Sequence, residues 1–531
     1  MLGSLVVSAC LSLSCGARPS IDAAAFVDPR QADCGLQAAI DAAADQGGGV
    51  VQVPAGRFPL RRGLVLRSAV AIVGAGTDKT VLVPDRKTVR LDVTADSPVE
   101  GRVFLKTIPA EFQVGSAVVS CREYPPSWYG SPRPAYVTFI DRAQGLVTLE
   151  APYGLNEMKP GKGYLTFGDA AALAKDVHRG DVEIHLRDAG LFRAGDEVTL
   201  GEPPNESLLA HAFVKEVKGN TLVLESPVKR DFPAWPPSDK IGNTKVNALV
   251  WAIFPLLHAA NVESCSVRDL TVQGHGFAQV RPMQTRYTLA GIHVYNGTGV
   301  VIEQVAVRDW PSDGISLQTG KGCRVSKCIV TGCLGNGLHP GTGLSQSRFE
   351  ENHVSENGAG LYFCWHNRQQ VVRKNLILRN RGAGIAGLGN PGDRENLIEE
   401  NVIAENGGPG IEINGGLRSG NAIRRNLIEN NSQAQPAKHP GIAIYASVED
   451  ARDYTIEANT IRDTQKSPTQ VVGVEEQDGS YRGKPTHAYE NLIRDNVFSG
   501  HRKADVWLTG PATRCERNGE ATVRREPVTE P

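Results

Sequence analysis

Gly337-Leu-His339 and Gly360-Leu-Tyr362 belong to a series of glycine–apolar pairs that recurs between residues 291 and 475. The first four pairs are 23 residues apart, and the later intervals lengthen from 24 to 32 residues. A period in this range indicates a repeat architecture. The full series is Gly291-Ile292, Gly314-Ile315, Gly337-Leu338, Gly360-Leu361, Gly384-Ile385, Gly410-Ile411, Gly441-Ile442 and Gly473-Val474.

A second motif, Asn-x-apolar-x-x-Asn, lies between these pairs, for example at Asn375–Asn380, Asn401–Asn406 and Asn426–Asn431. It predicts short alternating strands separated by Asn or Gly turns, which do not fit a helical period. A coil of about three strands per turn buries such strands, because each pairs in parallel with its equivalent one turn later. We therefore predict an all-β fold, a right-handed parallel β-helix, in which the asparagines stack as structural ladders.

The cysteines fit this interpretation. Ten are too few for a disulfide scaffold at this length. Cys328 and Cys333 stand in the register that asparagine fills in other turns, which predicts buried sulfur atoms packed as small apolar groups. No Cys-x-x-Cys or histidine spacing supports a metal site, so we expect none.

The repeat also predicts which side chains face outward. Side chains alternate across a strand, and equivalent residues of successive turns lie ~4.8 Å apart. The residue after each buried Ile or Leu gives a first outward row: His293, Ser316, His339, Tyr362, Ala386, Glu412, Ala443 and Glu475. Two residues further on, a second row reads Tyr295, Gln318, Gly341, Cys364, Leu388 and Asn414.

Composition limits the partners. The net charge is −1, so no global field recruits nucleic acid. The 57 glycines and the low aromatic content of 6% suit turn-rich β structure. A solenoid of 531 residues forms one elongated domain, and we expect a monomer.

Residues 1–20 form a short apolar run with small residues, which predicts an export signal and an extracytoplasmic location. Cys10 and Cys15 each resemble a bacterial lipoprotein cleavage site, so secretion and lipid anchoring both remain open. No later run approaches the length of a membrane helix, and any membrane contact would therefore be through this anchor.

Residues 21–82 are expected to form an N-terminal cap and the first turns of the coil. The amphipathic segment Cys34–Gln46 ends at Gly47–Gly49 and leads into the strand-and-turn segment Val50–Phe58 and later Val70–Thr77. This run resembles the N-terminal signature of the pectate lyase superfamily of β-helix proteins. The resemblance implies a capping helix and a polysaccharide partner.

Residues 83–240 interrupt the period and contain their own duplication. Phe112–Ser120 matches Phe192–Leu200, and Gly145–Pro152 matches Gly219–Pro227. We predict two inserted antiparallel β modules, which either wall a substrate groove or elaborate the cap. The coil then occupies residues 241–510, and a charged, frayed tail is expected at 511–531.

The middle of the outward face carries the candidate chemistry. Abstraction of the proton α to a carboxylate needs a base, an acid and cations that neutralise the uronate, which points to β-elimination or C5-epimerisation of an acidic glycan. His339 and Tyr362 are the expected acid–base pair. Arg368 is the expected carboxylate ligand, with Lys321 or Arg394. The candidate catalytic residues are His339, Tyr362, Arg368, His366 and Asp313. The candidate substrate-binding residues are Trp365 and Trp310 as stacking platforms, with Ser316, Gln318, Lys321, Asp393, Arg394 and Glu412.

Gly337-Leu-His339-Pro340-Gly-Thr resembles the Gly-Phe-Asp-Pro-His-Glu run of β-helix alginate epimerases. The match covers the coil and Gly-x-x-Pro only. The family's histidine falls at Gly341 here and its aspartate at His339, so its catalytic histidine is not carried over.

Two other classes remain open. A glycoside hydrolase would use Asp393, Glu412 or Asp313, since paired carboxylates stand about 5–10 Å apart. Galacturonan hydrolases of this superfamily carry Asp-Asp and Arg-Ile-Lys motifs; only Gly274-His275-Gly276 of their motifs is present, and His275 is expected to be a loop residue. A non-catalytic glycan-binding solenoid is the third class. Calcium assists many uronate enzymes of this architecture, but no loop here specifies it.

Overall fold

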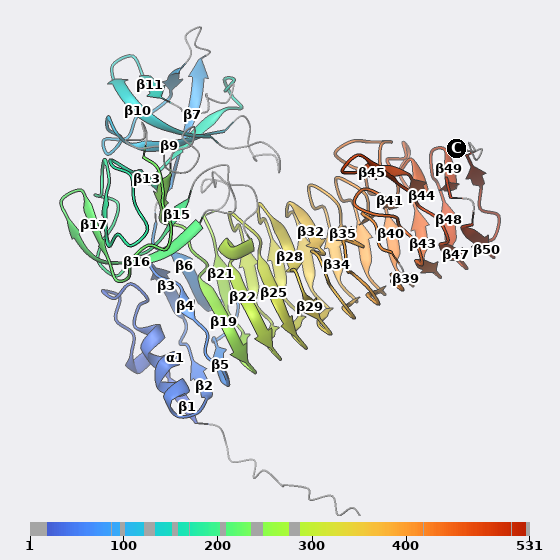
Figure 1. Ribbon diagram of the computed structural model, residues 1–531, viewed down its shortest axis with the longest axis horizontal. Coiled ribbons are helices and arrows are strands. Elements are labelled where there is room, and N and C mark those ends of the chain that lie inside the picture. Colours follow the sequence, from blue (N-terminus) through green and yellow to red (C-terminus); the bar gives the residue numbers. More distant parts are fainter. Residues whose placement is uncertain are drawn as a thin grey trace, which may run out of the picture.

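The computed structural model describes residues 19–86, 88–95, 101–121, 133–150, 158–168, 170–201, 209–234, 248–275, 287–417, 419–510 and 512–526. The described strands form three long parallel sheets wound into one right-handed coil, with two antiparallel modules beside its first turns (Figure 1). The prediction of a right-handed parallel β-helix is confirmed. Among the described helices, none has the length and apolar character of a membrane span.

The first sheet has 13 strands and holds one row of asparagine turns. Its strands, in spatial order, are β1 (Ser20–Asp22), β2 (Gly49–Gln52), β5 (Val70–Val73), β20 (Ser266–Arg268), β23 (Val301–Glu303), β26 (Arg324–Ser326), β30 (Arg348–Glu350), β33 (Val371–Arg373), β36 (Leu397–Glu399), β39 (Ala422–Arg424), β42 (Thr455–Glu457), β47 (Leu492–Arg494) and β50 (Arg514–Glu516).

A second sheet, here called the site sheet, carries the outward rows predicted above. Its strands are β4 (Leu64–Val65), β19 (Leu257–Glu263), β22 (Ile292–Thr298), β25 (Ile315–Lys321), β28 (Asn336–Pro340), β29 (Leu344–Ser345), β32 (Ala359–Tyr362), β35 (Ile385–Leu388), β38 (Ile411–Ile413), β41 (Ile442–Tyr445), β44 (Val472–Gln477), β49 (Ala504–Leu508) and β51 (Val523–Arg525).

The third sheet has 11 strands and closes the coil. Its strands are β3 (Gly56–Leu60), β6 (Thr80–Pro84), β21 (Thr271–Gln273), β24 (Ala306–Arg308), β27 (Ile329–Thr331), β31 (His353–Ser355), β34 (Leu376–Leu378), β37 (Val402–Ala404), β40 (Leu427–Glu429), β43 (Thr460–Arg462) and β48 (Val497–Ser499).

Buried asparagines form continuous ladders between the turns, as predicted. Asn401 is representative: its Nδ2 donates to the Val372 carbonyl at 2.9 Å and to Oδ1 of Asn426 at 2.9 Å. Its Oδ1 in turn accepts from the backbone N–H of Asn375 at 3.0 Å. Cys328 takes the same register, is 1% exposed, and carries no ladder amide. The ladders satisfy turn groups that burial would otherwise leave without partners.

The residue before each ladder position adopts a left-handed backbone conformation. Examples are Glu351, Lys374 and Glu400, with φ values between 54° and 58°. This conformation costs a non-glycine residue roughly 1–2 kcal/mol, which the ladder bonds and the packed interior offset.

The N-terminal end of the coil is covered by α1 (Leu36–Asp45), which contacts β1, β2 and β5. Leu36 and Ile40 of this helix are buried. The helix covers apolar residues and strand edges that the first turn would otherwise expose. Two short 3-10 helices, η1 (Ala23–Ala25) and η3 (Tyr287–Leu289), complete the described helices. The expected export signal falls mostly outside the described residues, and its last residue, Ser20, begins β1.

The chain leaves the coil after β6 and returns at β19, later than the boundary expected at residue 241. The two predicted antiparallel modules are confirmed, and Figure 1 shows them above the first turns. One is a closed barrel of β7 (Val89–Ala95), β8 (Arg102–Leu105), β9 (Ala117–Cys121), β10 (Arg133–Asp141), β11 (Leu146–Glu150) and β12 (Tyr164–Phe167). The other is a six-stranded sheet of β13 (Ala170–Ala172), β14 (Glu183–His185), β15 (Glu197–Gly201), β16 (Leu209–Lys218), β17 (Thr221–Leu224) and β18 (Leu249–Trp251).

The C-terminal segment differs from its prediction. Residues 512–526 were expected to fray, but β50 and β51 continue the first sheet and the site sheet. Cys515 pairs with Ile493, and Val523 with Val506. The charged residues of these strands project from a coil that still closes its interior. A small hairpin, β45 (Gly479–Tyr481) and β46 (Lys484–Thr486), projects from the preceding turn.

The register of the site sheet agrees with the predicted first row where the candidate chemistry lies. Ser316 pairs with His339, and Leu338 pairs with Leu361, which places His339 beside Tyr362 on the next turn. The second row fails at Leu388, which is fully buried and pairs with Ile413. A bulge before it, with Gly387 at φ 73°, reverses the side on which the side chain emerges.

Candidate functional site

An imidazole–carboxylate pair forms the centre of the site. Nδ1 of His339 in β28 lies 2.7 Å from Oδ2 of Asp313, which precedes β25. The other oxygen of Asp313 accepts from the backbone N–H of Asn336 at 2.8 Å and from its Nδ2 at 3.3 Å. Asp313 is fully buried. The carboxylate therefore orients the ring and favours a proton on Nδ1.

Two phenol rings flank this imidazole edge-to-face. The ring of Tyr362 in β32 lies 5.3 Å from that of His339, at 85°. The ring of Tyr287 in η3 lies 5.9 Å away, at 83°. Tyr287 is 41% exposed, whereas His339 is only 5% exposed. No repeat position predicts Tyr287, because this residue lies in the extra loop before the repeats.

A thiol completes the cluster of Asp313, His339, Tyr362 and Cys364, here called the His339 site. The sulfur of Cys364 lies 3.0 Å from Oγ1 of Thr342 and interacts with His339. Cys364 is half-buried. Its place in the second outward row, one turn after Gly341, was the available sequence signal, but we did not predict it as a site residue.

The environment shifts the protonation of each group. Burial lowers the pKa of His339, but the hydrogen bond to Asp313 and the interaction with Cys364 outweigh burial and raise that pKa to about 9. Burial raises the pKa of Tyr362 to about 12. Burial also raises the pKa of the Cys364 thiol, and its interaction with His339 more than reverses this, so the pKa is lowered. At neutral pH the site therefore holds an imidazolium and a neutral phenol.

Nε2 of His339 is the polar atom left for a ligand. It is buried and has no well-formed hydrogen bond among the described residues. Since Nδ1 is held by Asp313, this second nitrogen is the one that can exchange a proton with a substrate.

The turn after β35 places a second carboxyl group near the site. Asp393 is 3% exposed, and its Oδ1 accepts from the backbone N–H of Asn367 at 2.7 Å. Its Oδ2 is buried without a partner among the described residues, and burial raises the pKa of this carboxyl to about 9. Glu412 in β38 is half-buried, and burial raises its pKa too. Both carboxyls therefore favour their neutral forms more than exposed ones do.

The predicted carboxylate ligands form a separate row. Lys321 pairs with Ser345, Ser345 with Arg368, and Arg368 with Arg394, so the three cations follow the ends of successive strands. All three are exposed and line a small cavity of about 240 Å³. His339 and Tyr362 do not line this cavity. The basic row, Lys321, Arg368 and Arg394, is thus a surface of its own.

Two expected substrate-binding residues are structural. Ser316 and Gln318 are buried, and Nε2 of Gln318 donates to Oγ of Ser316 at 2.9 Å. Oε1 of Gln318 accepts from the backbone N–H of Thr342 at 3.0 Å. A Cβ on Gly341 would lie 2.0 Å from the Gln318 amide, so a larger residue there would displace that amide from its hydrogen bonds. These residues support the turn after β28 and are not presented to solvent.

The two tryptophans predicted as stacking platforms differ in exposure. Trp365 is 43% exposed, beside Cys364. Trp310 is 1% exposed, and its indole N–H donates to the Leu289 carbonyl at 2.7 Å, so its prediction as a platform is wrong. His366 is exposed, has a φ of 62° and faces Gly392 of the next turn.

Among the described residues, no group of three or more His, Cys, Asp or Glu side chains is placed to hold a metal ion.

Comparisons with known proteins agree with the coil. Residues 290–461 match the family described as the right-handed β-helix region. No curated protein matches this sequence. A mannuronan C-5 epimerase A-module from Azotobacter vinelandii is similar at 13% identity and a TM-score of 0.45, covering 93% of this chain and 99% of its own. An exopolygalacturonase from Thermotoga maritima is similar at 11% identity and a TM-score of 0.45, covering 95% and 92%. At these TM-scores neither likeness carries an argument about activity.

Proposed function

We propose that this protein processes an acidic polysaccharide by acid–base chemistry at the His339 site. The observation that carries the proposal is the 2.7 Å contact between Asp313 and His339 beside the phenol of Tyr362. A buried carboxylate that orients an imidazole, with a proton donor next to it, is the arrangement that proton abstraction requires. The reaction we favour is β-elimination, with C5-epimerisation sharing its first step.

The base in this proposal is the minor, unprotonated form of His339, because the imidazolium predominates at neutral pH. Nε2 of His339, in its unprotonated form, takes the proton from the carbon α to the uronate carboxylate. The electron pair released forms a carbon–carbon double bond as the bond to the glycosidic oxygen breaks. Tyr362 donates its phenolic proton to that oxygen, because burial keeps the phenol neutral. In epimerisation Tyr362 donates its phenolic proton to the opposite face of the same carbon, and the glycosidic bond is kept.

The surface around the His339 site has features that suit the binding of a polymeric anion. The basic row lies at the strand ends, where it would bind uronates of the same chain away from the reacting sugar. Trp365, which follows Cys364 in the segment leading to Arg368, presents an exposed indole, which suits the apolar face of a sugar.

A glycoside hydrolase is the second candidate, favoured by Asp393. Its buried Oδ2 and raised pKa suit a general acid, with Glu412 as the other carboxylate. Asp313 is a weaker member of such a pair, because its carboxylate is bound to His339 and Asn336.

The test is a panel of uronate and neutral polysaccharides with the wild type, His339→Gln and Tyr362→Phe. Tyr481→Phe, in the β45–β46 hairpin, is the control. Ultraviolet-absorbing product from a uronate, lost in both site variants and kept in the control, supports elimination. Inversion at C5 of the uronate, detected by NMR without any ultraviolet-absorbing product, assigns epimerisation. Reducing ends without absorbance, lost in Asp393→Asn, assign the hydrolase. Binding without any product leaves a glycan-binding solenoid and overturns the enzyme proposal.

Export is proposed from the sequence of residues 1–20 alone. Cell fractionation of the full chain tests it, with Cys10→Ser and Cys15→Ser separating lipid anchoring from secretion. Retention of all variants in the cytoplasm would contradict export. Sedimentation of the purified protein tests the expected monomer.

A further inference from the structure

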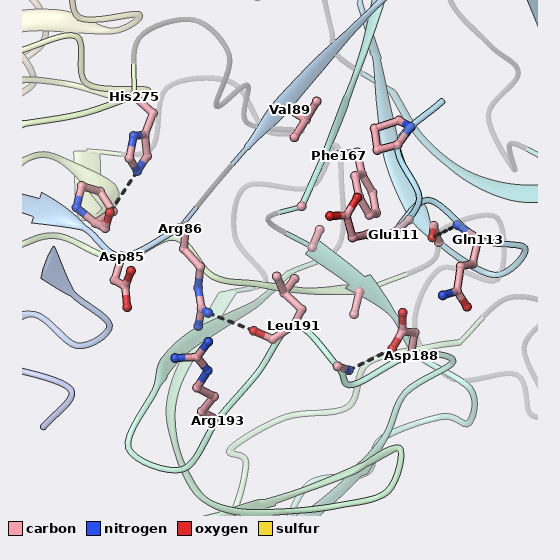
Figure 2. Close-up of a pocket in the computed structure, with 18 of the residues that line it drawn as sticks. Asp85, Arg86, Val89, Glu111, Gln113, Phe167, Asp188, Leu191, Arg193 and His275 are labelled. Carbon is pink, nitrogen blue, oxygen red and sulfur yellow. Dashed lines mark hydrogen bonds between the residues drawn. The ribbon is translucent and has the colours of Figure 1, made fainter. Parts of the chain in front are cut away.

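A cavity of about 1020 Å³ lies where the coil meets both inserted modules. The ends of β3 and β6, the loops of the barrel and the turn between β14 and β15 contribute its walls (Figure 2). Its volume is at the upper end of the usual range of small-molecule sites, ~300–1,000 Å³. None of the residues of the His339 site or of the basic row lines it. We call it the junction cavity.

One wall of the junction cavity is cationic. Arg86 and Arg193 both line this wall, and Figure 2 shows their side chains at the same side of the cavity. The Arg86 side chain is 6% exposed, donates from Nη1 to the Leu191 carbonyl at 2.9 Å, and pairs with Asp196. Asp196 also pairs with Arg61 at 2.6 Å, and Arg61 lies 4.0 Å from Asp85, so two carboxylates serve these two guanidinium groups. The uncompensated positive charge on this wall is that of Arg193, whose side chain forms no ion pair within the described ranges.

Two donors on this wall await an acceptor. Nε of Arg86 is buried and has no hydrogen-bond partner among the described residues. Arg193 is exposed to the cavity and forms no side-chain ion pair within the described ranges. An anionic oxygen in the cavity would bind both guanidinium groups and lower the repulsion between them.

The facing wall accepts hydrogen bonds. Glu111 and Asp188 present carboxylates, and Gln113 an amide, across the cavity from the two arginines (Figure 2). Phe167, held edge-to-face by Phe112 at 5.1 Å, adds a flat apolar surface. Carboxylates that accept from hydroxyl groups, and a ring that covers carbon–hydrogen faces, are the two features that a sugar needs.

We propose that the junction cavity is a second ligand site that takes an acidic sugar. The sugar carboxylate lies on Arg193 and Arg86, its hydroxyls donate to Glu111 and Asp188, and one face rests on Phe167. The inserted modules then have a binding role of their own. The inference follows from the cavity and does not depend on catalysis at His339.

The experiment measures binding of galacturonate, glucuronate and their short oligomers by calorimetry. The protein is the full chain carrying His339→Gln, so that turnover cannot change the ligand. Further variants in that background are Arg193→Gln and Glu111→Gln. The matched control is Arg179→Gln, an exposed arginine of the same module that does not line the cavity. Arg368→Gln reports any binding at the basic row.

The expected result is saturable uronate binding that Arg193→Gln weakens at least tenfold, Glu111→Gln weakens less, and Arg179→Gln and Arg368→Gln leave unchanged. Neutral sugars bind more weakly than uronates. Absence of uronate binding, or binding that survives Arg193→Gln and Glu111→Gln, overturns the proposal. Loss of binding only in Arg368→Gln assigns the ligand to the basic row and also overturns it. Polysaccharide turnover by Arg193→Gln with an intact His339 is scored separately, so failure of either proposal is distinguishable.

Discussion

Nδ1 of His339 lies 2.7 Å from Oδ2 of Asp313, although the two residues are 26 positions apart and belong to successive turns of the coil. The parallel register brings them together: Gly314-Ile315 and Gly337-Leu338 stand at equivalent places, so the segment before β25 borders the row that carries His339. This pair controls the charge of the site.

The first prediction concerns the pH dependence of catalysis. If His339 is the base, kcat/KM for a uronate polymer rises with pH and levels off above its pKa of about 9. His339→Gln lowers kcat/KM by roughly 10²–10⁴-fold. A pH series of initial rates is the measurement. A rate that falls through pH 9 would instead make the imidazolium the acid.

The second prediction concerns Asp313→Asn. Asparagine keeps a hydrogen-bonding side chain but loses the charge that raises the pKa of His339, so that pKa falls. The rising limb of the pH profile shifts to lower pH, and NMR titration of the imidazole reports the same shift. An unchanged titration would show that Asp313 does not set the protonation of His339. Asp309→Asn, outside the site, is the control.

The same pair predicts how stability varies with pH. A histidine whose folded pKa is raised from 6.5 to about 9 stabilises the fold fully below pH 6.5 and loses that contribution as pH rises through 9. Asp313→Asn reduces this loss. The check is the difference in unfolding free energy between wild type and variant at pH 6 and pH 10. The wild type should show the larger decline.

A buried carboxyl predicts the effect of Asp393→Asn. The folded pKa of Asp393 is raised from 3.8 to about 9, so the folded state holds a proton that the unfolded chain releases. Wild-type stability therefore falls by about 1.4 kcal/mol per pH unit between these values from this group. The variant lacks this dependence, and should gain Tm relative to wild type at pH 8 but not at pH 3.5. Equal Tm differences at both pH values would contradict a buried neutral carboxyl.

The thiol beside the imidazole predicts selective alkylation. Cys364 is half-buried and its pKa is lowered by His339, whereas burial raises the pKa of Cys328 to about 12. Iodoacetamide at pH 7 should modify Cys364 and leave Cys328 unmodified. His339→Gln should slow the reaction, because the thiolate loses its cationic neighbour. Mass spectrometry of peptides gives both rates. Equal rates with and without His339 would contradict the interaction.

The ladder prediction concerns Asn401→Ala. The substitution removes donors and an acceptor that serve Val372, Asn375 and Asn426 in a fully buried turn. Each buried group left unsatisfied costs about 1–3 kcal/mol, so the loss should be several kcal/mol. Glu405→Ala, an exposed neighbour, should change stability by no more than about 0.5 kcal/mol. Chemical denaturation measures both.

The sequence predicted the coil because its period is translational, and a fixed interval sets the register of every turn it covers. The repeat did not predict the bulge at Gly387, where one extra residue reverses the side of the sheet on which the Leu388 side chain emerges. The two antiparallel modules were predicted from their duplication, but the closure of one of them into a barrel was not, because no repeat sets the register of its strands. His339 and Tyr362 were found by counting along one row. Asp313 was named, but its bond to His339 depends on how the chain enters β25. Arg368 was grouped with Lys321 and Arg394, but the repeat did not show that these cations line a cavity without His339 and Tyr362.

The asparagine ladders make the coil a one-dimensional lattice in which each turn touches only its two neighbours. Its stability is then a sum of nearest-neighbour couplings and is not shared across the molecule. A weakened ladder position, such as Asn401, would uncouple the turns on either side of it. The N-terminal turns that carry the His339 site and the C-terminal turns beyond Asn401 would then unfold as two separate cooperative units. Additional turns would not restore the lost coupling at that position. Activity at the His339 site would persist after the C-terminal unit has unfolded.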